Sequence, residues 1–147
     1  MATTWIVAAD ESRARVLQVT GQRERLAEID HLSNPEGRAQ NRELETDAEP
    51  RFHGNPGPAS DREAQGAVEQ SVRTFAKEVG RYLDKARLER RYDELVLVAP
   101  PKFLGALRKE LGKEVEKLVA EELPKDLSWF NARELERYFE KGSGRAP

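Results

Sequence analysis

The chain has no cysteine among its 147 residues. Disulfides, thiolate nucleophiles and cysteine-ligated zinc sites are therefore excluded, which fits a reducing compartment. No apolar run of about 20 residues occurs, and the N-terminus lacks a basic start followed by a long apolar stretch. We therefore expect a soluble, cytoplasmic protein that makes no membrane contact.

The chain also lacks an excess of one charge. It carries 25 basic and 27 acidic residues, for a net charge of −2, although charged residues make up 35% of the sequence. Any binding to nucleic acid must then come from a local basic patch, because there is no bulk attraction. The length allows one domain with a real core. We predict a single domain over residues 1–141.

Histidine is scarce as well, and nothing links its two occurrences to a site. His31 and His53 lie far apart and have no partner at metal-ligand spacing, so each is expected to be an ordinary polar residue. No serine is marked as a nucleophile. We predict no catalytic residue, no metal site and no cofactor, and favour a protein that is not an enzyme.

The most informative stretch runs from Leu95 to Leu111. Leu95–Ala99 is apolar without alternation, which is typical of a parallel strand covered on both faces. Pro100 and Pro101 end it, and Pro101 suits the first position of a helix. Four apolar residues then recur at helical spacing: Phe103, Leu104, Leu107 and Leu111. A buried strand that leads into an amphipathic helix is half of a βαβ unit.

Three short strands are predicted before this unit. They cover Trp5–Ala9, Arg13–Thr20 and, more weakly, Leu26–Ser33, with turn-forming residues between them. Tight connections of this kind favour an antiparallel three-strand meander. Asp10 follows the first strand, where we expect it to accept backbone N–H groups in the turn.

Residues 34–65 are predicted to form a long loop. They have no apolar periodicity and hold four of the eight prolines: Pro35, Pro50, Pro56 and Pro58. Loops of this length are usually functional or disordered. Two interpretations stay open, a flexible insertion and a contact with a protein partner.

The clearest predicted helix covers Gly66–Arg90. One side is an apolar stripe, expected to lie on the sheet: Val68, Val72, Phe75, Val79, Tyr82 and Ala86. The opposite side is a basic row, expected to face solvent: Arg73, Lys77, Arg81 and Lys85. The row is either a solvated helix face or a track for RNA phosphates. No aromatic residue is interleaved with it, which argues against contact with single-stranded bases.

The C-terminal part is predicted to add a strand and a helix. Residues 117–123 fit a strand better than a helical continuation, and Asn131 with Glu134 resembles a capping box at the start of the last helix. Trp129 and Phe130 are expected to be core or staple residues. Residues 142–147 form a flexible tail. The fold class is therefore α/β, with a mixed sheet and the order meander, then α-β-α-β-α.

Several motifs resemble the bacterial host attachment protein family, over nearly the whole chain. They are Trp5–Asp10 with Arg13-Ala-Arg15, Asn34-Pro35-x-Gly37-Arg38, Arg42-Glu-Leu-x-Thr-Asp47, Phe75-Ala76, Asp93 to Arg108 with its Leu-Val-Leu-Val-Ala-Pro-Pro core, and Lys125-Asp-Leu-Ser128. Family members often continue Asp-x-x-Gly-Arg, whereas this chain has Asp47-Ala-Glu-Pro-Arg51.

The family in turn resembles the central domain of archaeal and eukaryotic peptide release factors. That likeness implies a ribonuclease-H-like arrangement and contact with a ribosome or RNA. Release factors carry Gly-Gly-Gln before their first long helix, and this chain has Glu63-Ala-Gln65-Gly66 there, so release activity is not implied. The family label itself implies a role in attachment to host cells.

Three functions follow as hypotheses. The leading one is a non-catalytic module that binds the ribosome, RNA or a translation-related partner through the basic row. The alternative is a factor that promotes bacterial attachment to host cells through protein or glycan contacts. The third is a hydrolase of RNA or peptidyl-tRNA, and it rests on positional analogy alone.

Overall fold

The computed structural model describes residues 2–20, 25–35 and 58–142, without the side chains of 58–65, 141 and 142. Its elements follow in the order β1 (Thr4–Ala9), β2 (Arg13–Thr20), β3 (Arg25–Ser33), α2 (Pro58–Leu88), β4 (Glu94–Val98), α3 (Pro101–Glu110), α4 (Lys113–Glu116), β5 (Val119–Leu123) and α5 (Ala132–Gly142). The predicted α/β class is confirmed. No helix in these ranges has both the length and the apolar character of a membrane span.

One five-stranded mixed sheet organises the domain, with the strand order β3-β2-β1-β4-β5. β1 and β2 are antiparallel, as are β2 and β3, whereas β4 is parallel to both β1 and β5. The predicted covered parallel strand is therefore confirmed at β4.

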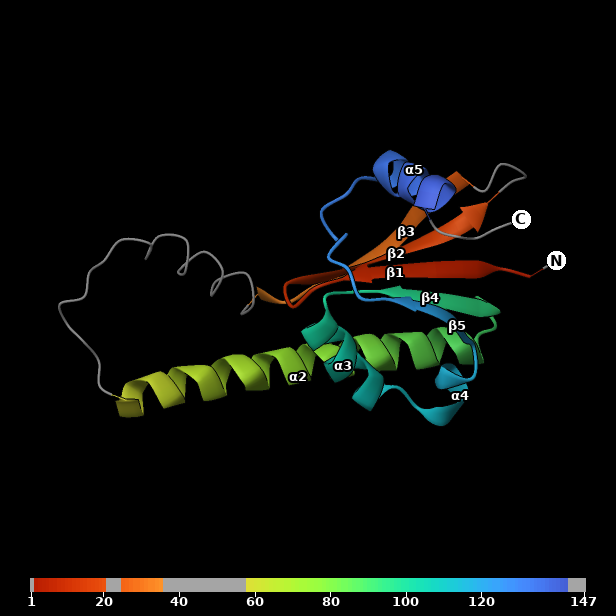
Figure 1. The fold of residues 1–147 in the computed structure, drawn as a ribbon. Coiled ribbons are helices and arrows are strands. Elements are labelled where there is room, and N and C mark those ends of the chain that lie inside the picture. The colour runs from red at the N-terminus through yellow and green to blue at the C-terminus, as the bar shows by residue number, and fades with distance from the viewer. Residues whose placement is uncertain (1, 21–24, 36–57, 143–147) are drawn as a thin grey trace.

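The sheet is the middle of three layers, with α2, α3 and α4 on one face and α5 on the other (Figure 1). We call these faces the α2 side and the α5 side. Side chains of a strand alternate between the faces. In β4, Leu95 and Leu97 pack on the α2 side, whereas Val96 and Val98 pack on the α5 side. This explains why the strand reads as a continuous apolar run.

Helix α2 is longer than the sequence predicts. It begins at Pro58 instead of Gly66, so the last eight residues of the predicted 34–65 loop are helical. Residues 36–57 of that loop lie outside the described residues. The N-terminal part of α2 projects beyond the sheet (Figure 1), and residues 58–65 lack the apolar periodicity from which helices are predicted.

The apolar stripe of α2 faces the sheet as predicted. Phe75, Val79 and Ala86 are buried, while Val72 and Tyr82 are half-buried against the same core. Two aromatic contacts fix the C-terminal end of α2. Between ring centroids, Trp5 of β1 lies 6.2 Å from Tyr82 of α2 and 4.9 Å from Tyr92, which follows the helix. α2 is therefore a rigid support for whatever its outer side carries.

The remaining elements largely match the expectations. α3 begins at Pro101 and buries Phe103, Leu104 and Leu107. β5 confirms the strand predicted within residues 117–123, but the short helix α4 before it was not predicted. α5 has the predicted capping box, because Glu134 N–H donates to Asn131 Oδ1 and Asn131 N–H donates to Glu134 Oε1, both at 2.8 Å.

Candidate functional site

The predicted basic row occupies the outer side of α2. Arg73, Lys77, Arg81 and Lys85 are all exposed. Within the described part of the chain none of the four side chains forms an ion pair or hydrogen bond, although Glu69 and Glu78 are close in sequence. Like charges four residues apart on a helix repel one another. The row therefore destabilises α2 slightly while leaving four cationic groups free for an anionic ligand.

Two adjoining hollows lie between this row and a second set of basic residues. They meet where Gly80 of α2 contacts the end of α3, since a Cβ atom at Gly80 would lie 2.9 Å from Glu110 O. The wall on the α3–α4 side carries three exposed lysines, Lys102, Lys109 and Lys113. We call the two hollows together the α2–α3 groove. Seven exposed basic side chains line its two walls.

The acids of the groove are fewer and partly neutralised. Asp84 forms a 2.9 Å ion pair with Arg87, and Glu114 lies 3.4 Å from Lys117. Glu11, Glu69 and Glu110 remain. A local excess of positive charge thus exists on a chain whose net charge is −2. Sequence reasoning missed the three lysines because they lie on other elements, although their spacing of seven and four residues was a usable signal.

A second cluster of polar residues lies where β1 and β5 end. Asp10 Oδ1 accepts the backbone N–H groups of Ser12 and Arg13 at 2.8 and 3.0 Å, so its predicted role in the turn is confirmed. Its other oxygen accepts a 2.9 Å hydrogen bond from Ser128 Oγ. Within the described residues, no group of three His, Asp or Glu side chains is placed to hold a metal ion.

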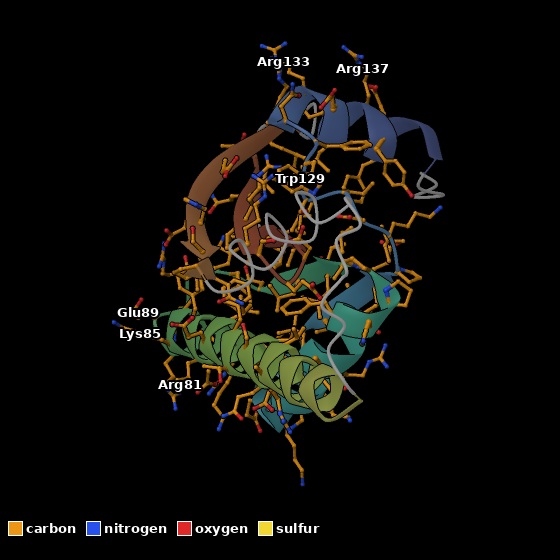
Figure 2. The ribbon with its side chains drawn as sticks, turned by 90° about the vertical axis from the view of Figure 1, so that its left-hand side faces the viewer. Arg81, Lys85, Glu89, Trp129, Arg133 and Arg137 are labelled. Atoms are coloured by element: carbon orange, nitrogen blue, oxygen red, sulfur yellow. The ribbon has the colours of Figure 1, made fainter. Side chains whose placement is uncertain are left out.

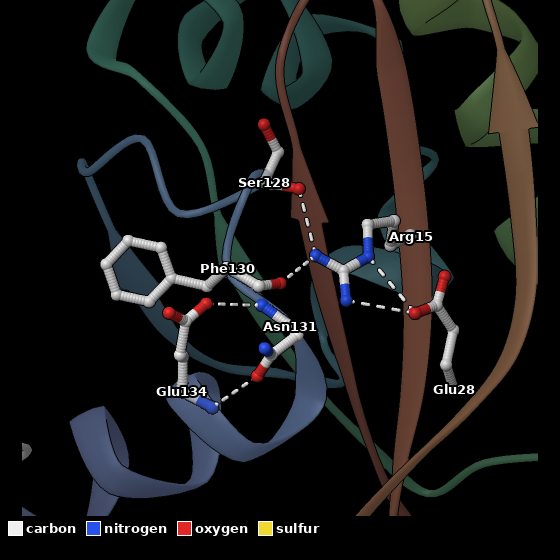
Figure 3. A network of polar contacts seen from close by, with 6 residues as sticks. All are labelled: Arg15, Glu28, Ser128, Phe130, Asn131 and Glu134. Carbon is white, nitrogen blue, oxygen red and sulfur yellow. Dashed lines mark hydrogen bonds and ion pairs between the residues drawn. The ribbon is translucent and has the colours of Figure 1, made fainter.

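Arg15 holds the loop that follows β5 (Figure 3). Its guanidinium donates to the carbonyl oxygens of Ser128, at 2.9 Å, and of Phe130. The same group pairs with Glu28 of β3 at 2.9 Å. Arg15 is only 7% exposed. A buried charge is costly unless it is paired and hydrogen-bonded, and here it is both. The backbone on either side of Trp129 is therefore fixed.

Trp129 contradicts the prediction of a core or staple residue. Its side chain is 65% exposed, whereas that of Trp5 is fully buried. The Arg13 guanidinium carbon lies 3.6 Å from the Trp129 ring centroid, within cation–π range. Only Phe130 behaves as a staple, packing with Leu135 in the core of the α5 side. In the sequence, Trp129 lies in a polar loop just before a predicted helix. This position does not indicate whether the ring points into the core or towards solvent.

Two tyrosines, the half-buried Tyr82 and the buried Tyr92, connect α2 to its surroundings. Tyr82 donates a 2.7 Å hydrogen bond to Asp30 Oδ2 on β3, and this bond lowers the pKa of Asp30. Burial, followed by the contact with Asp30, raises the pKa of Tyr82 to about 12. Tyr92 donates to Leu83 O at 2.7 Å, and burial raises its pKa to about 12. Neither hydroxyl is poised to exchange a proton near neutral pH.

The histidines do not extend either cluster. His31 is exposed and lies 3.3 Å from Ser33 Oγ, while His53 is outside the described residues.

A cavity of about 340 Å³ lies under α5, and its lining mixes Arg25, Arg133 and Arg137 with three glutamates. Arg133 and Arg137 extend from α5 on the opposite side of the molecule from Arg81 and Lys85 (Figure 2).

The family described as "Protein required for attachment to host cells" matches residues 5–139. The chain belongs to this family. An uncharacterized protein of Rickettsia prowazekii (strain Madrid E), RP470, is 38% identical over 64 residues, which are 42% of this chain and 43% of that protein. The resemblance drawn from the motifs is thereby confirmed.

Two solved structures are similar at low identity. One is an archaeal translation termination factor, aRF1, with a TM-score of 0.47 and 12% identity over 82% of this chain and 29% of that one. The other is described as an archaeal protein, with a TM-score of 0.49 and 11% identity over 97% of this chain and 34% of that one. The chain spans less than half the length of each of these relatives.

Proposed function

We propose that the protein is a non-catalytic module that binds RNA, with the ribosome as its target, and that the α2–α3 groove is the contact surface. The carrying observation is the set of seven exposed basic side chains on the two walls of this groove. Phosphate contacts from Lys and Arg supply most of the affinity of such proteins. The four basic side chains of the row on α2, which have no side-chain partner among the described residues, line one wall of this groove.

The same proposal places the protein in the cytoplasm and relates its fold to the ribonuclease-H-like arrangement. Absence of cysteine fits action in the cytoplasm. The strand order β3-β2-β1-β4-β5 supports the ribonuclease-H-like arrangement that the family resemblance implies. Fold alone does not carry the function, because unrelated activities share folds. The argument for RNA therefore rests on the groove.

The test is co-sedimentation with purified bacterial ribosomes, together with filter binding to ribosomal RNA. Arg81→Glu/Lys85→Glu reverses two charges in the groove, and Arg133→Glu/Arg137→Glu makes the same change in net charge on α5. We expect the first variant to lose about tenfold or more in affinity and to lower the salt slope by about 2, as two lost phosphate contacts require. The second should bind as the wild type does. Equal losses in both variants, or no binding by the wild type, would overturn the proposal.

A second candidate is the attachment role that the family description names. Attachment through protein or glycan contacts requires the protein to reach the cell surface. Cell fractionation with an antibody against the chain separates the two candidates. Protein at the surface or in the medium supports direct attachment, whereas protein confined to the cytosol excludes it.

A further inference from the structure

We propose that Trp129 stacks on an unpaired base, so that the RNA bound at the α2–α3 groove is single-stranded beside the turn between β1 and β2. This inference rests on the proposed RNA contact and names the class of RNA. No aromatic residue is interleaved with the basic row on α2, and Trp129 comes instead from the loop after β5, where its ring contacts Arg13 beside the turn between β1 and β2.

Trp129 is exposed yet held in place. The carbonyl groups of Ser128 and Phe130, its two neighbours, both accept hydrogen bonds from Arg15. The Ser128 hydroxyl is anchored on Asp10 at 2.9 Å, and the capping box of α5 begins at Asn131. A tryptophan has only two side-chain torsions, so a fixed backbone leaves little entropy to lose on binding. The ring is thus presented to solvent in a preorganised way.

An arginine lies beside the Trp129 ring. Arg13 lies 3.6 Å from the Trp129 ring centroid, and within the described residues its buried Nε has no hydrogen-bond partner. Single-stranded bases are bound by stacking on aromatic rings and on arginine planes, and a cation close to the ring also attracts the phosphate that follows each base. The pair Arg13–Trp129 supplies both groups at one point.

The turn between β1 and β2 connects the α2–α3 groove with Arg13. Glu11 lines the α2–α3 groove together with Arg73 and Lys102. Arg13 is two residues further along the same turn, which is at most about 7 Å between Cα atoms. The turn is fixed by the Asp10 carboxylate. A strand whose phosphates follow the groove would pass this turn, and Arg13 on the turn contacts the Trp129 ring. In a duplex the base faces are stacked on each other and unavailable.

A protein partner fits the surroundings of Trp129 less well. Three large apolar side chains are exposed in the described part of the chain, and they lie on three different segments: Ile29, Leu88 and Trp129. Protein-binding hot spots are ringed by further contacts that exclude water. The exposed residues just before Trp129, Lys125 and Asp126, are instead charged, and Leu127 is buried. A single exposed tryptophan ring beside basic side chains therefore fits an RNA base better than a protein surface.

The test measures the affinity of the full chain for a 12-nucleotide single strand, the same strand with abasic sites, and the matching duplex. Trp129→Ala should weaken single-strand binding about 5- to 150-fold, the range of one lost stacking contact. Trp129→Phe should retain most of the affinity. The salt slope and the affinity for the duplex and for the abasic strand should not change. Trp5 remains in Trp129→Ala, so its buried emission reports whether the variant is folded.

Each outcome separates this inference from the proposed function. If Trp129→Ala binds the single strand as the wild type does, while Arg81→Glu/Lys85→Glu binds weakly, the groove is right and the stacking role is wrong. Equal losses for single strand and duplex also overturn stacking. If Trp129→Ala loses ribosome co-sedimentation but keeps single-strand affinity, Trp129 contacts a ribosomal protein and the inference fails. No RNA binding by the wild type removes both proposals.

Discussion

On the α2 side of the sheet, nineteen described residues form one buried apolar cluster, and α2, α3 and α4 all contribute to it or cover it. On the α5 side, seven described residues form the corresponding cluster, under a single helix. On the α5 side, polar contacts add to the stabilisation that the smaller apolar cluster provides. Arg15 binds the loop before α5, and Glu136 of α5 accepts a 2.8 Å hydrogen bond from Leu26 N–H on β3.

This contrast bears on the two candidate contact features. The basic row belongs to a helix fixed by close packing, since Gly80 lets the backbone of α2 approach that of α3. Trp129 belongs to a loop fixed by hydrogen bonds. Packing is insensitive to a change in one polar group, whereas a hydrogen-bonded loop depends on a few atoms. The two features should therefore respond to different substitutions.

The largest expected effect compares one apolar deletion on each side. Phe75 is buried on the α2 side, 5.9 Å from Phe103 between ring centroids, and Leu135 is buried on the α5 side. Phe75→Ala should cost about 3–5 kcal/mol of unfolding free energy. Leu135→Ala should cost less, about 2–3 kcal/mol, because one helix can shift to close the cavity. Urea unfolding measures both. An equal or larger cost for Leu135→Ala would show that the α5 side is as tightly packed.

The next effect concerns the polar contacts of the α5 side. Arg15→Met keeps the length of the side chain but removes the donors to Ser128 O and Phe130 O. We expect a loss of about 2–3 kcal/mol, because buried carbonyls are left unsatisfied. Glu28→Gln is the matched control. The Glu28 side chain is 39% exposed, so its ion pair with Arg15 should contribute under about 1 kcal/mol. A smaller loss for Arg15→Met than for Glu28→Gln would contradict the assigned role of Arg15.

A pH effect is expected on the α2 side. Burial raises the pKa of Tyr92 to about 12, above its unfolded value of about 10. The contribution of Tyr92 to stability is then fully present below pH 10 and is lost as the pH rises towards 12. Tyr92→Phe should cost about 1 kcal/mol at pH 7, through the hydrogen bond to Leu83 O. The difference between the variant and the wild type should shrink in unfolding curves above pH 10. A constant difference would contradict the buried hydroxyl.

How much the sequence could predict follows from the same contrast. β4, α3 and the sheet-facing stripe of α2 were predicted because burial imposes a periodicity that the residues display. The capping box of α5 was predicted because it is local, with Asn131 and Glu134 three residues apart. The first turns of α2 were not predicted, because that part projects beyond the sheet and has no stripe to reveal it.

The candidate site was predicted only in part, for a related reason. The row from Arg73 to Lys85 lies on one helix and is visible as a spacing of four. Lys102 and Lys109 become part of the same groove only when α3 packs beside α2. The hydrogen bond from Arg15 to Ser128 O, which holds the backbone before Trp129, joins residues that are 113 positions apart. Contacts across such a distance depend on the strand order, which no local pattern encodes.

The smallest expected effect lies at the end of α2. Arg91 N–H donates to Ala86 O at 3.0 Å and Arg90 N–H donates to Arg87 O at 2.9 Å, the pattern of a Schellman motif. Arg90 has φ of 57°, in the left-handed region that favours glycine. Arg90→Gly should therefore raise the unfolding free energy by about 0.5–1 kcal/mol.

Arg91→Gly is the control for this change. Arg91 does not have a positive φ, and its guanidinium carbon lies 5.1 Å from the Trp5 ring centroid. Glycine there should lower stability, because it removes the contact and gains nothing from the backbone. Hydrogen exchange should show the gain of Arg90→Gly in the last turns of α2 and no change around Trp129. A change at both places would mean that the two sides of the sheet unfold locally as one unit.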